Sequence, residues 1–370
     1  MRALILKMHL WLALVTGAFI FIVALTGAAL VFEAEIDRAL NVKTSYVTPR
    51  GATLPVEAIV ARVHDAFPDM TVDDVVIPDR PDLSCRVRMK AARDFSVFVN
   101  PYTGDMLGTR DLSTGDFGRG FARTIHLLHA RLMGGLAGKY VVGAITVITL
   151  VIIVSGLYLW WGRKIPRVLW SGSWKRVNFD LHNVFGFYAA PFLVYVTLSG
   201  VIMSFEGYTD SFLRRHFNTR PDVVPRVKST VIEGATRLSV DAALRVADEA
   251  LPGAVTTIIS VPATPTDAFR VTRRFPEDRS GAGRSRLYID QYRGQVLSLK
   301  STRTDELGTT IVNIKRGVHT GDFLGWPTRI IAFISCLFLV GQIVTGVLIW
   351  WTRIRVPMRT TAGERSESVR

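Results

Sequence analysis

The sequence predicts a membrane α-helical four-helix bundle with two α+β domains outside the membrane, related by an internal two-fold duplication. Four apolar stretches are long enough to cross the hydrocarbon layer, which takes about 20 residues. They are Leu10–Phe32, Tyr140–Trp161, Leu181–Phe205 and Ile330–Trp351. Two longer, more polar segments separate them, and polar landmarks recur at the same offsets in both halves. Such recurrence indicates two parallel copies of one unit.

The landmarks that recur are histidines followed, at a fixed distance, by a glycine. Four histidine–glycine pairs share two offsets: His9 with Gly27, His182 with Gly200, His129 with Gly156, and His319 with Gly346. A serine or threonine precedes each of these glycines. Glu33 and Glu206 also lie at equal distances from the first histidine of their halves. The repeated unit therefore carries its polar residues at defined places along apolar helices.

The composition limits the class of protein. The chain has 370 residues, of which 49% are hydrophobic, and its mean hydropathy is +0.27. This balance fits membrane spans combined with aqueous domains. The net charge of +14 does not indicate a nucleic-acid partner, because the arginines are scattered and form no basic helix. Cys85 and Cys336 have neither disulfide nor zinc-ligand spacing.

The basic residues predict the orientation of the spans. Five of them occupy the link between the second and third spans: Arg163, Lys164, Arg167, Lys175 and Arg176. Three more follow the last span: Arg353, Arg355 and Arg359. Short loops rich in Lys and Arg stay in the cytoplasm, so both termini are expected there and segments 34–139 and 206–329 outside. The first span starts like a signal peptide, but its length and its recurrence inside the chain argue against cleavage.

Each outer segment follows the same order of predicted elements. Helical spacing of apolar residues covers 54–67 and 238–251. Alternating runs then predict strands at Thr71–Ile77, Ser84–Lys90 and Phe95–Val99, and at Thr256–Val261, Ala268–Arg273 and Arg286–Ile289. A turn with a glycine suited to positive φ, Gly104 or Gly294, precedes a last strand. We expect each outer domain to be a helix on its own small antiparallel sheet, with a binding or shaping role.

We interpret the four repeated histidines as two pairs of axial haem ligands, because paired imidazoles in a helix bundle are typical of haem sites. His9 and His182 lie at cytoplasmic helix ends, and His129 and His319 on the outer side. A pseudo-two-fold axis along the membrane normal would bring each pair to one level. No CxxCH sequence is present, so two non-covalent haem b groups are expected. The alternative for each histidine is an ordinary polar residue at the membrane interface.

His126 is a further candidate on the outer side, because it lies one helical turn before His129. Its counterpart in the second half is Arg316, so it could be a ligand, an alternative ligand or a partner of a haem propionate. His64 and His216 have no counterparts and are interpreted as solvated.

The repeated glycines are candidates for contact with a flat cofactor. Two lie toward the outer surface and two toward the inner one: Gly27 and Gly200, then Gly156 and Gly346. Ordinary packing of helices through small residues explains them equally well. Gly134 and Gly135 are expected to separate a short outer helix, 126–132, from the second span. Glu33 and Glu206 are interpreted as helix terminators or, alternatively, as a proton or substrate gate.

Several motifs resemble a known family. The helix, the strands and the turns Asn100–Gly104 and Asp290–Gly294 resemble PepSY domains. The histidine motifs at 9–11, 126–129, 180–183 and 319–321, with the two Trp-Trp ends, extend the resemblance to the PepSY-associated transmembrane family over about residues 1–352. The resemblance implies a bacterial inner-membrane protein linked to iron acquisition, in a family that includes haem-containing ferric-siderophore reductases.

The resemblance and the repeat together predict the domain boundaries. A first span (1–33) leads to a periplasmic PepSY-like domain (34–125), then to a short outer helix with the second span (126–162) and a basic cytoplasmic loop (163–180). A third span (181–206), a second periplasmic PepSY-like domain (207–318), an outer segment with the fourth span (319–352) and a cytoplasmic tail (353–370) follow.

The expected function is that of an oxidoreductase. Electrons from a cytoplasmic or quinol donor would pass through haem b to a ferric siderophore in the periplasm, which would release Fe(II). Two alternatives stay open: a siderophore or metal uptake accessory or permease component without redox activity, and a PepSY-type regulatory binding protein. No catalytic side chain is expected, and a homodimer is compatible with the sequence.

Overall fold

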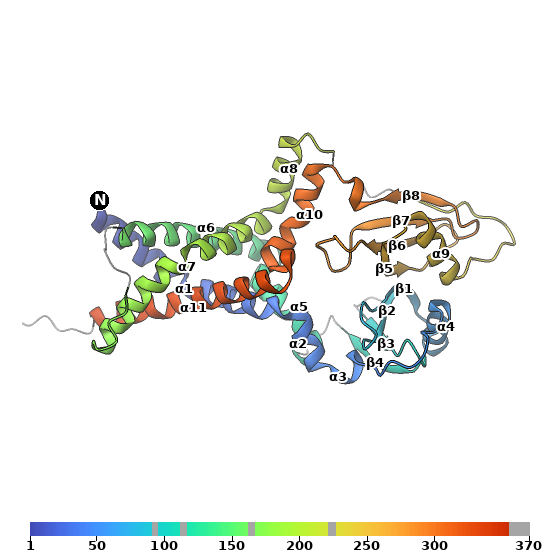
Figure 1. The fold of residues 1–370 in the computed structure, drawn as a ribbon, viewed down its shortest axis with the longest axis horizontal. Helices are drawn as coiled ribbons and strands as arrows, with labels where there is room; N and C mark the ends of the chain where they lie inside the picture. The colour runs from blue at the N-terminus through green and yellow to red at the C-terminus, as the bar shows by residue number, and fades with distance from the viewer. Residues whose placement is uncertain (91–94, 112–116, 162–166, 221–226, 355–370) are drawn as a thin grey trace, which may run out of the picture.

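A computed structural model describes residues 1–90, 95–111, 117–161, 167–220 and 227–354 (Figure 1). Four helices in it are long and apolar enough to cross a membrane: α1 (Arg2–Val31), α6 (Gly135–Trp160), α7 (Trp174–Ser204) and α11 (Trp326–Ile354). They form one bundle, in which α1 and α7 each pack against both α6 and α11. The chain is therefore a membrane protein with a separate antiparallel sheet at one end of its bundle.

Short helices connect the bundle to the sheet. On the N-terminal half these are α2 (Glu33–Leu40), α3 (Val42–Ser45) and α5 (Phe117–Arg131). On the C-terminal half they are α8 (Glu206–His216), α10 (Leu307–Thr320) and two 3₁₀ turns, η1 (Thr302–Thr304) and η2 (Asp322–Leu324). We call the end of the bundle that joins these helices the sheet-side end, and the opposite end the far end.

The predicted break before the second span is confirmed, but the helix before it is longer than expected. That helix, α5, begins at Phe117 rather than at residue 126. Leu132 and Met133 have positive φ angles of 45° and 60°, and α6 starts at Gly135. A Cβ atom on Gly138 would lie 1.8 Å from the Arg131 carbonyl oxygen, so only glycine allows the chain to turn this tightly.

The sheet has eight antiparallel strands in the order β4-β3-β2-β1-β5-β6-β7-β8. The first four are β1 (Thr71–Val76), β2 (Cys85–Lys90), β3 (Phe95–Val99) and β4 (Met106–Asp111). The others are β5 (Val255–Ser260), β6 (Phe269–Arg274), β7 (Ser285–Ile289) and β8 (Val296–Lys300). Gly104 and Gly294 have φ angles of 77° and 69°, as their predicted turn positions require.

The expectation of two separate small sheets was wrong. β1 pairs with β5 through Val75 and Ile259, so the two halves share one sheet. Edge strands expose unpaired backbone groups, and pairing the two edges satisfies them. The helices α4 (Val56–Ala66) and α9 (Val240–Ala250) cover the same face, and one hydrophobic core continues beneath both. The order of elements in the first half recurs in the second.

The two covering helices cap each other. Asp241, in the first turn of α9, accepts hydrogen bonds from the backbone N–H groups of Val56 (2.9 Å) and Glu57 (3.0 Å) at the start of α4. Glu57 in turn accepts one from the backbone N–H of Val240 at the start of α9, and pairs with Arg237 at 2.8 Å. A carboxylate at a helix start satisfies free N–H groups and complements the helix dipole. This exchange holds the two halves in register.

Half of the eight basic residues that predicted the orientation lie outside the described residues. These are Arg163, Lys164, Arg355 and Arg359. Arg167 and Arg176 are described, and Arg176 pairs with Asp180 at 3.0 Å at the start of α7. The orientation of the termini stays a prediction.

Replacing either capping carboxylate should loosen both halves of the sheet domain. We expect Glu57→Gln and Asp241→Asn each to destabilise the domain by about 1 kcal/mol. The double variant should cost less than the sum, because the two residues belong to one network. Hydrogen–deuterium exchange of the full chain in detergent measures this at the amides of Val56, Glu57 and Val240. Glu249→Gln, an exposed change on α9, is the control; unchanged exchange in both capping variants would contradict the assignment.

Candidate functional site

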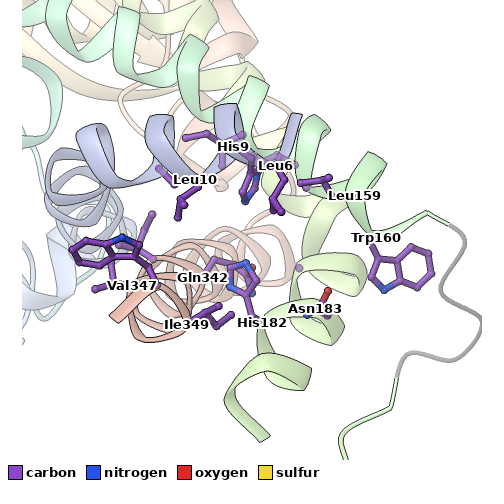
Figure 2. A pocket seen from close by; sticks show the side chains of 18 of the residues that line it. Leu6, His9, Leu10, Leu159, Trp160, His182, Asn183, Gln342, Val347 and Ile349 are labelled. Atoms are coloured by element: carbon purple, nitrogen blue, oxygen red, sulfur yellow. The ribbon is translucent and has the colours of Figure 1, made fainter. Parts of the chain in front are cut away.

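The structure places the four repeated histidines at two levels of the bundle. At the sheet-side end, His129 on α5 and His319 on α10 lie together, with ring centres 6.1 Å apart and ring planes inclined by 36°. At the far end, His9 on α1 and His182 on α7 both line one cavity (Figure 2). The pairing inferred from the repeat is thus present in the fold. The role of these residues as ligands stays a prediction.

Each histidine of the sheet-side pair lies against a glycine of a neighbouring membrane helix. A Cβ atom on Gly27 would lie 3.0 Å from Cε1 of His129, and one on Gly200 would lie 3.6 Å from Cε1 of His319. Nδ1 of His129 donates to the carbonyl of Val23 at 2.9 Å. Oγ1 of Thr26, the residue before Gly27, also lies 3.3 Å from Nδ1 of His129. Small residues therefore let the imidazoles reach the helix backbone.

The same arrangement holds His319. Its Nδ1 lies 3.0 Å from Oγ of Ser199, the residue before Gly200. The Tyr195 hydroxyl donates to the carbonyl of Val318, the residue before this histidine. Tyr195 was not a sequence candidate, because only the fold brings it beside α10. Two contacts from α7 thus fix the end of α10 that carries the imidazole.

The far pair repeats the pattern with the remaining two glycines. Nδ1 of His9 is 3.0 Å from Oγ of Ser155, and Nδ1 of His182 is 2.9 Å from Oγ1 of Thr345. Gly156 follows Ser155, and Gly346 follows Thr345. A Cβ atom on Gly156 would lie 3.2 Å from Cε1 of His9, and one on Gly346 would lie 3.3 Å from Cε1 of His182. All four histidines therefore meet a Ser/Thr-Gly pair on another helix.

The hydroxyl groups determine which ring nitrogen carries the proton. A hydroxyl group has one hydrogen to donate. The Ser155 hydroxyl donates it to the Ile152 carbonyl at 2.9 Å. Thr345 likewise donates to the Gly341 carbonyl at 2.7 Å, and Ser199 to the Val196 carbonyl at 2.9 Å. Each hydroxyl is then an acceptor, so the facing Nδ1 must donate. Nε2 of each neutral imidazole keeps its lone pair, which is the form that binds a metal.

The far-end cavity has a volume of about 370 Å³, within the roughly 300–1,000 Å³ of cofactor and ligand pockets. Its walls are mostly apolar and come from α1, α6, α7 and α11. Gly156 and Gly346 line it beside the two histidines. Lys7 and Arg353 contribute positive charge to the lining. A flat apolar group with acidic substituents would match this combination.

The remaining histidines are separate from these pairs. The ring contact with His319 is made by His129 and not by His126, so the geometry favours His129 as the outer candidate. His64 on α4 is exposed, as predicted. His216 on α8 is also exposed and stacks on Phe212 at 6.0 Å between ring centres.

The two boundary glutamates have different surroundings, although their sequence positions are equivalent. Burial raises the pKa of Glu33, and the charge of Arg316 opposes this. Glu206 pairs with Lys139 at 2.6 Å, and this hydrogen bond lowers the pKa of the Glu206 carboxyl. The symmetry of the sequence is therefore broken at the sheet-side end.

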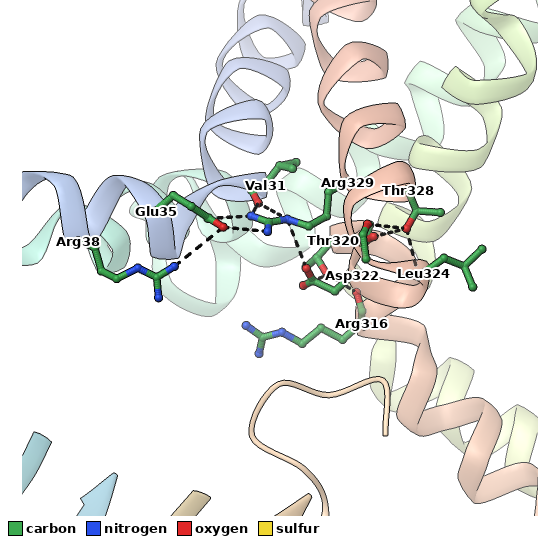
Figure 3. A network of polar contacts seen from close by, with 11 residues as sticks. Val31, Glu35, Arg38, Arg316, Thr320, Asp322, Leu324, Thr328 and Arg329 are labelled. Carbon is green, nitrogen blue, oxygen red and sulfur yellow. Dashed lines mark hydrogen bonds and ion pairs between the residues drawn. The ribbon is translucent and has the colours of Figure 1, made fainter. Parts of the chain in front are cut away.

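An arginine that the sequence analysis missed joins two spans at this end. Arg329, at the start of α11, donates to the last carbonyl of α1, that of Val31, at 2.6 Å (Figure 3). It also makes two bonds to the Glu35 carboxylate, at 2.9 and 2.8 Å. A guanidinium that satisfies a helix C-terminus and a carboxylate together holds α1 beside α11 near His129. The sequence feature that could have identified Arg329 is its position as a single arginine at the edge of an apolar run.

Filling the space beside a histidine should strain the bundle. We expect Gly27→Ala to lower the stability of the protein in detergent by about 1–3 kcal/mol, because the new Cβ would press on His129. Gly341→Ala on α11 is the matched control, since nothing lies within 4 Å of its added Cβ. Thermal unfolding followed by circular dichroism compares the two. Equal unfolding midpoints for the two variants would show that the close contact between Gly27 and His129 does not affect stability.

Comparison with known proteins agrees with these findings. No curated protein matches the chain. A family model, described as the PepSY-associated TM region, matches residues 6–353. The match covers all four membrane helices almost completely, together with the whole sheet. The chain therefore belongs to the PepSY-associated transmembrane family.

Proposed function

We propose that this protein is a haem b protein of the bacterial inner membrane that reduces a ferric siderophore in the periplasm and releases Fe(II). Electrons would come from a cytoplasmic or quinol donor. Both termini would lie in the cytoplasm, so the shared sheet would lie in the periplasm, with two PepSY-like halves related by duplication. The observation that carries the proposal is that four imidazoles each bond through Nδ1 to an oxygen on another helix, and that no described residue makes a hydrogen bond to their Nε2 atoms.

The pairing of the histidines supports haem over a free metal ion. A structural or catalytic zinc takes three or four protein ligands. Two imidazoles instead suit a metal whose other ligands come from a macrocycle. Among the described residues, no group of three or more His, Cys, Asp or Glu side chains is placed to hold a metal ion. Each two-residue site would therefore leave the remaining metal ligands to a macrocycle such as haem.

The spacing of the sheet-side pair also fits. His129 and His319 would both hold the group, so their rings must lie close together. His129 and His319 have ring centres 6.1 Å apart. At the far end, His9 and His182 face a cavity whose glycines leave room for a flat group. Lys7 and Arg353 would pair with its acidic substituents.

When bound, haem supplies one-electron chemistry. The protein holds the two levels apart: His9 and Gly27 lie on the same helix, α1, and a rise of 1.5 Å per residue separates them by about 27 Å. Most side chains of the four helices between these levels are apolar. The histidines keep their Nδ1 protons on hydroxyl or carbonyl oxygens, which raises the basicity of Nε2.

The substrate chemistry needs no nucleophile. Oxygen donors such as hydroxamates hold hard Fe(III) much better than Fe(II). Transfer of one electron to the chelated iron weakens its complex, so the iron is released without a covalent intermediate on the protein. The sheet-side histidine pair lies nearest the aqueous domain, and it is therefore the proposed exit for electrons.

Loss of one histidine should empty one haem site only. We expect His9→Ala and His182→Ala to lose the same low-spin haem, and His129→Ala and His319→Ala to lose the other. Within a pair, the double variant should lose no more than either single one, because the two residues serve one site. Haem content and absorption spectra of the purified variants measure this. His64→Ala and His216→Ala are controls; full haem content in all four test variants would rule out these ligands.

Reduction should depend on the sheet-side pair. Dithionite-reduced protein, kept anaerobic, is mixed with a ferric trihydroxamate and a ferric tris-catecholate while haem reoxidation and Fe(II) trapping are followed together. We expect wild-type protein to react faster than free haem in detergent. His319→Ala should remove most of this rate, because it removes a proposed ligand of the haem from which electrons would pass to the chelate.

A rate no greater than that of free haem, across several chelates, would overturn the reductase proposal. Protein that carries haem but reduces no chelate would favour an uptake accessory. Protein without haem would favour a regulatory binding role for the sheet domain.

A further inference from the structure

The sheet has one face that α4 and α9 do not cover. The buried face carries Val87 and Ile259 beneath α4 and α9. Residues that alternate with these point to the opposite side, since side chains along a strand alternate between faces. We call this side the helix-free face. Its basic residues include Arg86, Arg88, Arg110, Arg270, Arg286 and Lys300.

Only part of this positive charge is balanced. Arg88 pairs with Asp74 on the same face, and Arg110 pairs with Asp37 on α2. Lys300 lies 3.6 Å from Asp305. In contrast, three arginines have no carboxylate partner among the described residues: Arg86, Arg270 and Arg286. The face therefore has an excess of positive charge.

Arg86 is the most unusual of these residues. Its side chain is partly buried, and Nε has no hydrogen-bond partner in the described part of the chain. Burial, followed by the charge of Arg88, lowers the pKa of Arg86. An Nε–H group that has lost water without gaining a hydrogen-bond partner is costly. An anionic ligand would supply the missing contacts.

The arginines frame an apolar centre. The strand register puts Arg86, Val76, Ile258, Thr272 and Arg286 in one row across the sheet. Neighbouring strands are about 4.8 Å apart, so the two arginines are about 19 Å apart at their backbones. The three residues between them are partly exposed. This row suits a ligand with an apolar or aromatic body and anionic groups around it.

The helix-free face is directed toward the helices that lead to the bundle. On the first half, a Cβ atom on Gly108 would lie 3.0 Å from Cγ2 of Thr44 in α3. On the second half, Arg284, directly before β7, donates to Asn313 on α10 at 3.0 Å. The sheet is thus connected to the same helix that carries His319.

Arg316 extends the positive charge toward the histidines. Asn313, Arg316 and His319 are spaced three residues apart on α10, so they follow one side of that helix. In Figure 3 the Arg316 side chain lies apart from the Glu35–Arg329 pair, on the side of this network that faces the strands. Arg284 and Arg316 therefore place positive charge between the sheet and His319.

We propose that the helix-free face, together with Arg316, binds an anionic ferric chelate with carboxylate or catecholate oxygens, and presents it to His319. The reduction of this ligand rests on the function proposed above, whereas its binding does not. Guanidinium groups match carboxylate oxygens with two parallel hydrogen bonds. A surface of one charge sign also raises the local concentration of an oppositely charged ligand.

The test uses Ga(III) chelates, which share the charge of the Fe(III) complexes and cannot be reduced under these conditions. Isothermal titration calorimetry of the full-length protein compares a trianionic Ga(III) tris-catecholate with a neutral Ga(III) trihydroxamate. We expect the anionic chelate to bind at least about tenfold more tightly at low salt, and the advantage to shrink as salt is added.

The variants locate the site. Arg86→Gln combined with Arg286→Gln should weaken the anionic chelate by about tenfold or more, and Arg316→Gln by a smaller factor. The matched control is Arg62→Gln combined with Arg245→Gln. This control removes two positive charges from α4 and α9, the helices that cover the opposite face of the sheet. Circular dichroism and size-exclusion chromatography in detergent check that each variant is folded.

The outcomes separate the two proposals. Equal affinity for both chelates, or equal weakening by the test and control variants, would overturn the assignment of this face. Tight binding to the helix-free face without reduction of the Fe(III) form would overturn the proposed reductase function and leave the binding site in place.

Discussion

The structure depends on how four imidazoles are satisfied inside an apolar bundle. A histidine N–H with no partner is costly in the membrane interior, and each of the four instead donates to a hydroxyl or carbonyl oxygen on a different helix. These bonds connect α1 with α6, α5 with α1, α7 with α11, and α10 with α7. A glycine beside each bond permits the close approach. The contacts therefore determine which helices face one another at both levels.

The sheet domain is coupled to this bundle by charged residues at its sheet-side end. Arg329 joins the end of α1 to α11 and binds Glu35 on α2. Farther out, β1 pairs with β5, and Glu57 and Asp241 cap each other's helices. The two halves of the chain thus meet twice, once in the bundle and once in the sheet. A ligand on the helix-free face would contact both halves.

Much of the fold could be predicted, because its strongest signals are local. Apolar length identified the four spans, and alternation identified strands such as Phe95–Val99, whose bounds agree with β3. The histidine–glycine offsets predicted which residues share a level, and the structure places His9 beside Gly156 and His182 beside Gly346. Their role in holding haem stays a prediction.

What the sequence did not predict depends on contacts between distant segments. The joining of β1 to β5 pairs two edges whose strands contain no pattern specific for each other. The exchanged caps of Glu57 and Asp241 look like ordinary acidic residues in a first helical turn. The contact of Tyr195 with the end of α10 depends on how that helix docks. The start of α5 was missed because its first turns lack a strong apolar period.

The central claim is that the two histidine pairs hold two haem groups. The most direct measurement is the absorption spectrum and haem content of the full-length protein, purified in detergent from cells supplied with iron and a haem precursor. The account predicts a six-coordinate, low-spin b-type spectrum and two haem groups per chain. Folded protein with no haem, or with a high-spin spectrum that shows an open coordination position at both levels, would contradict it.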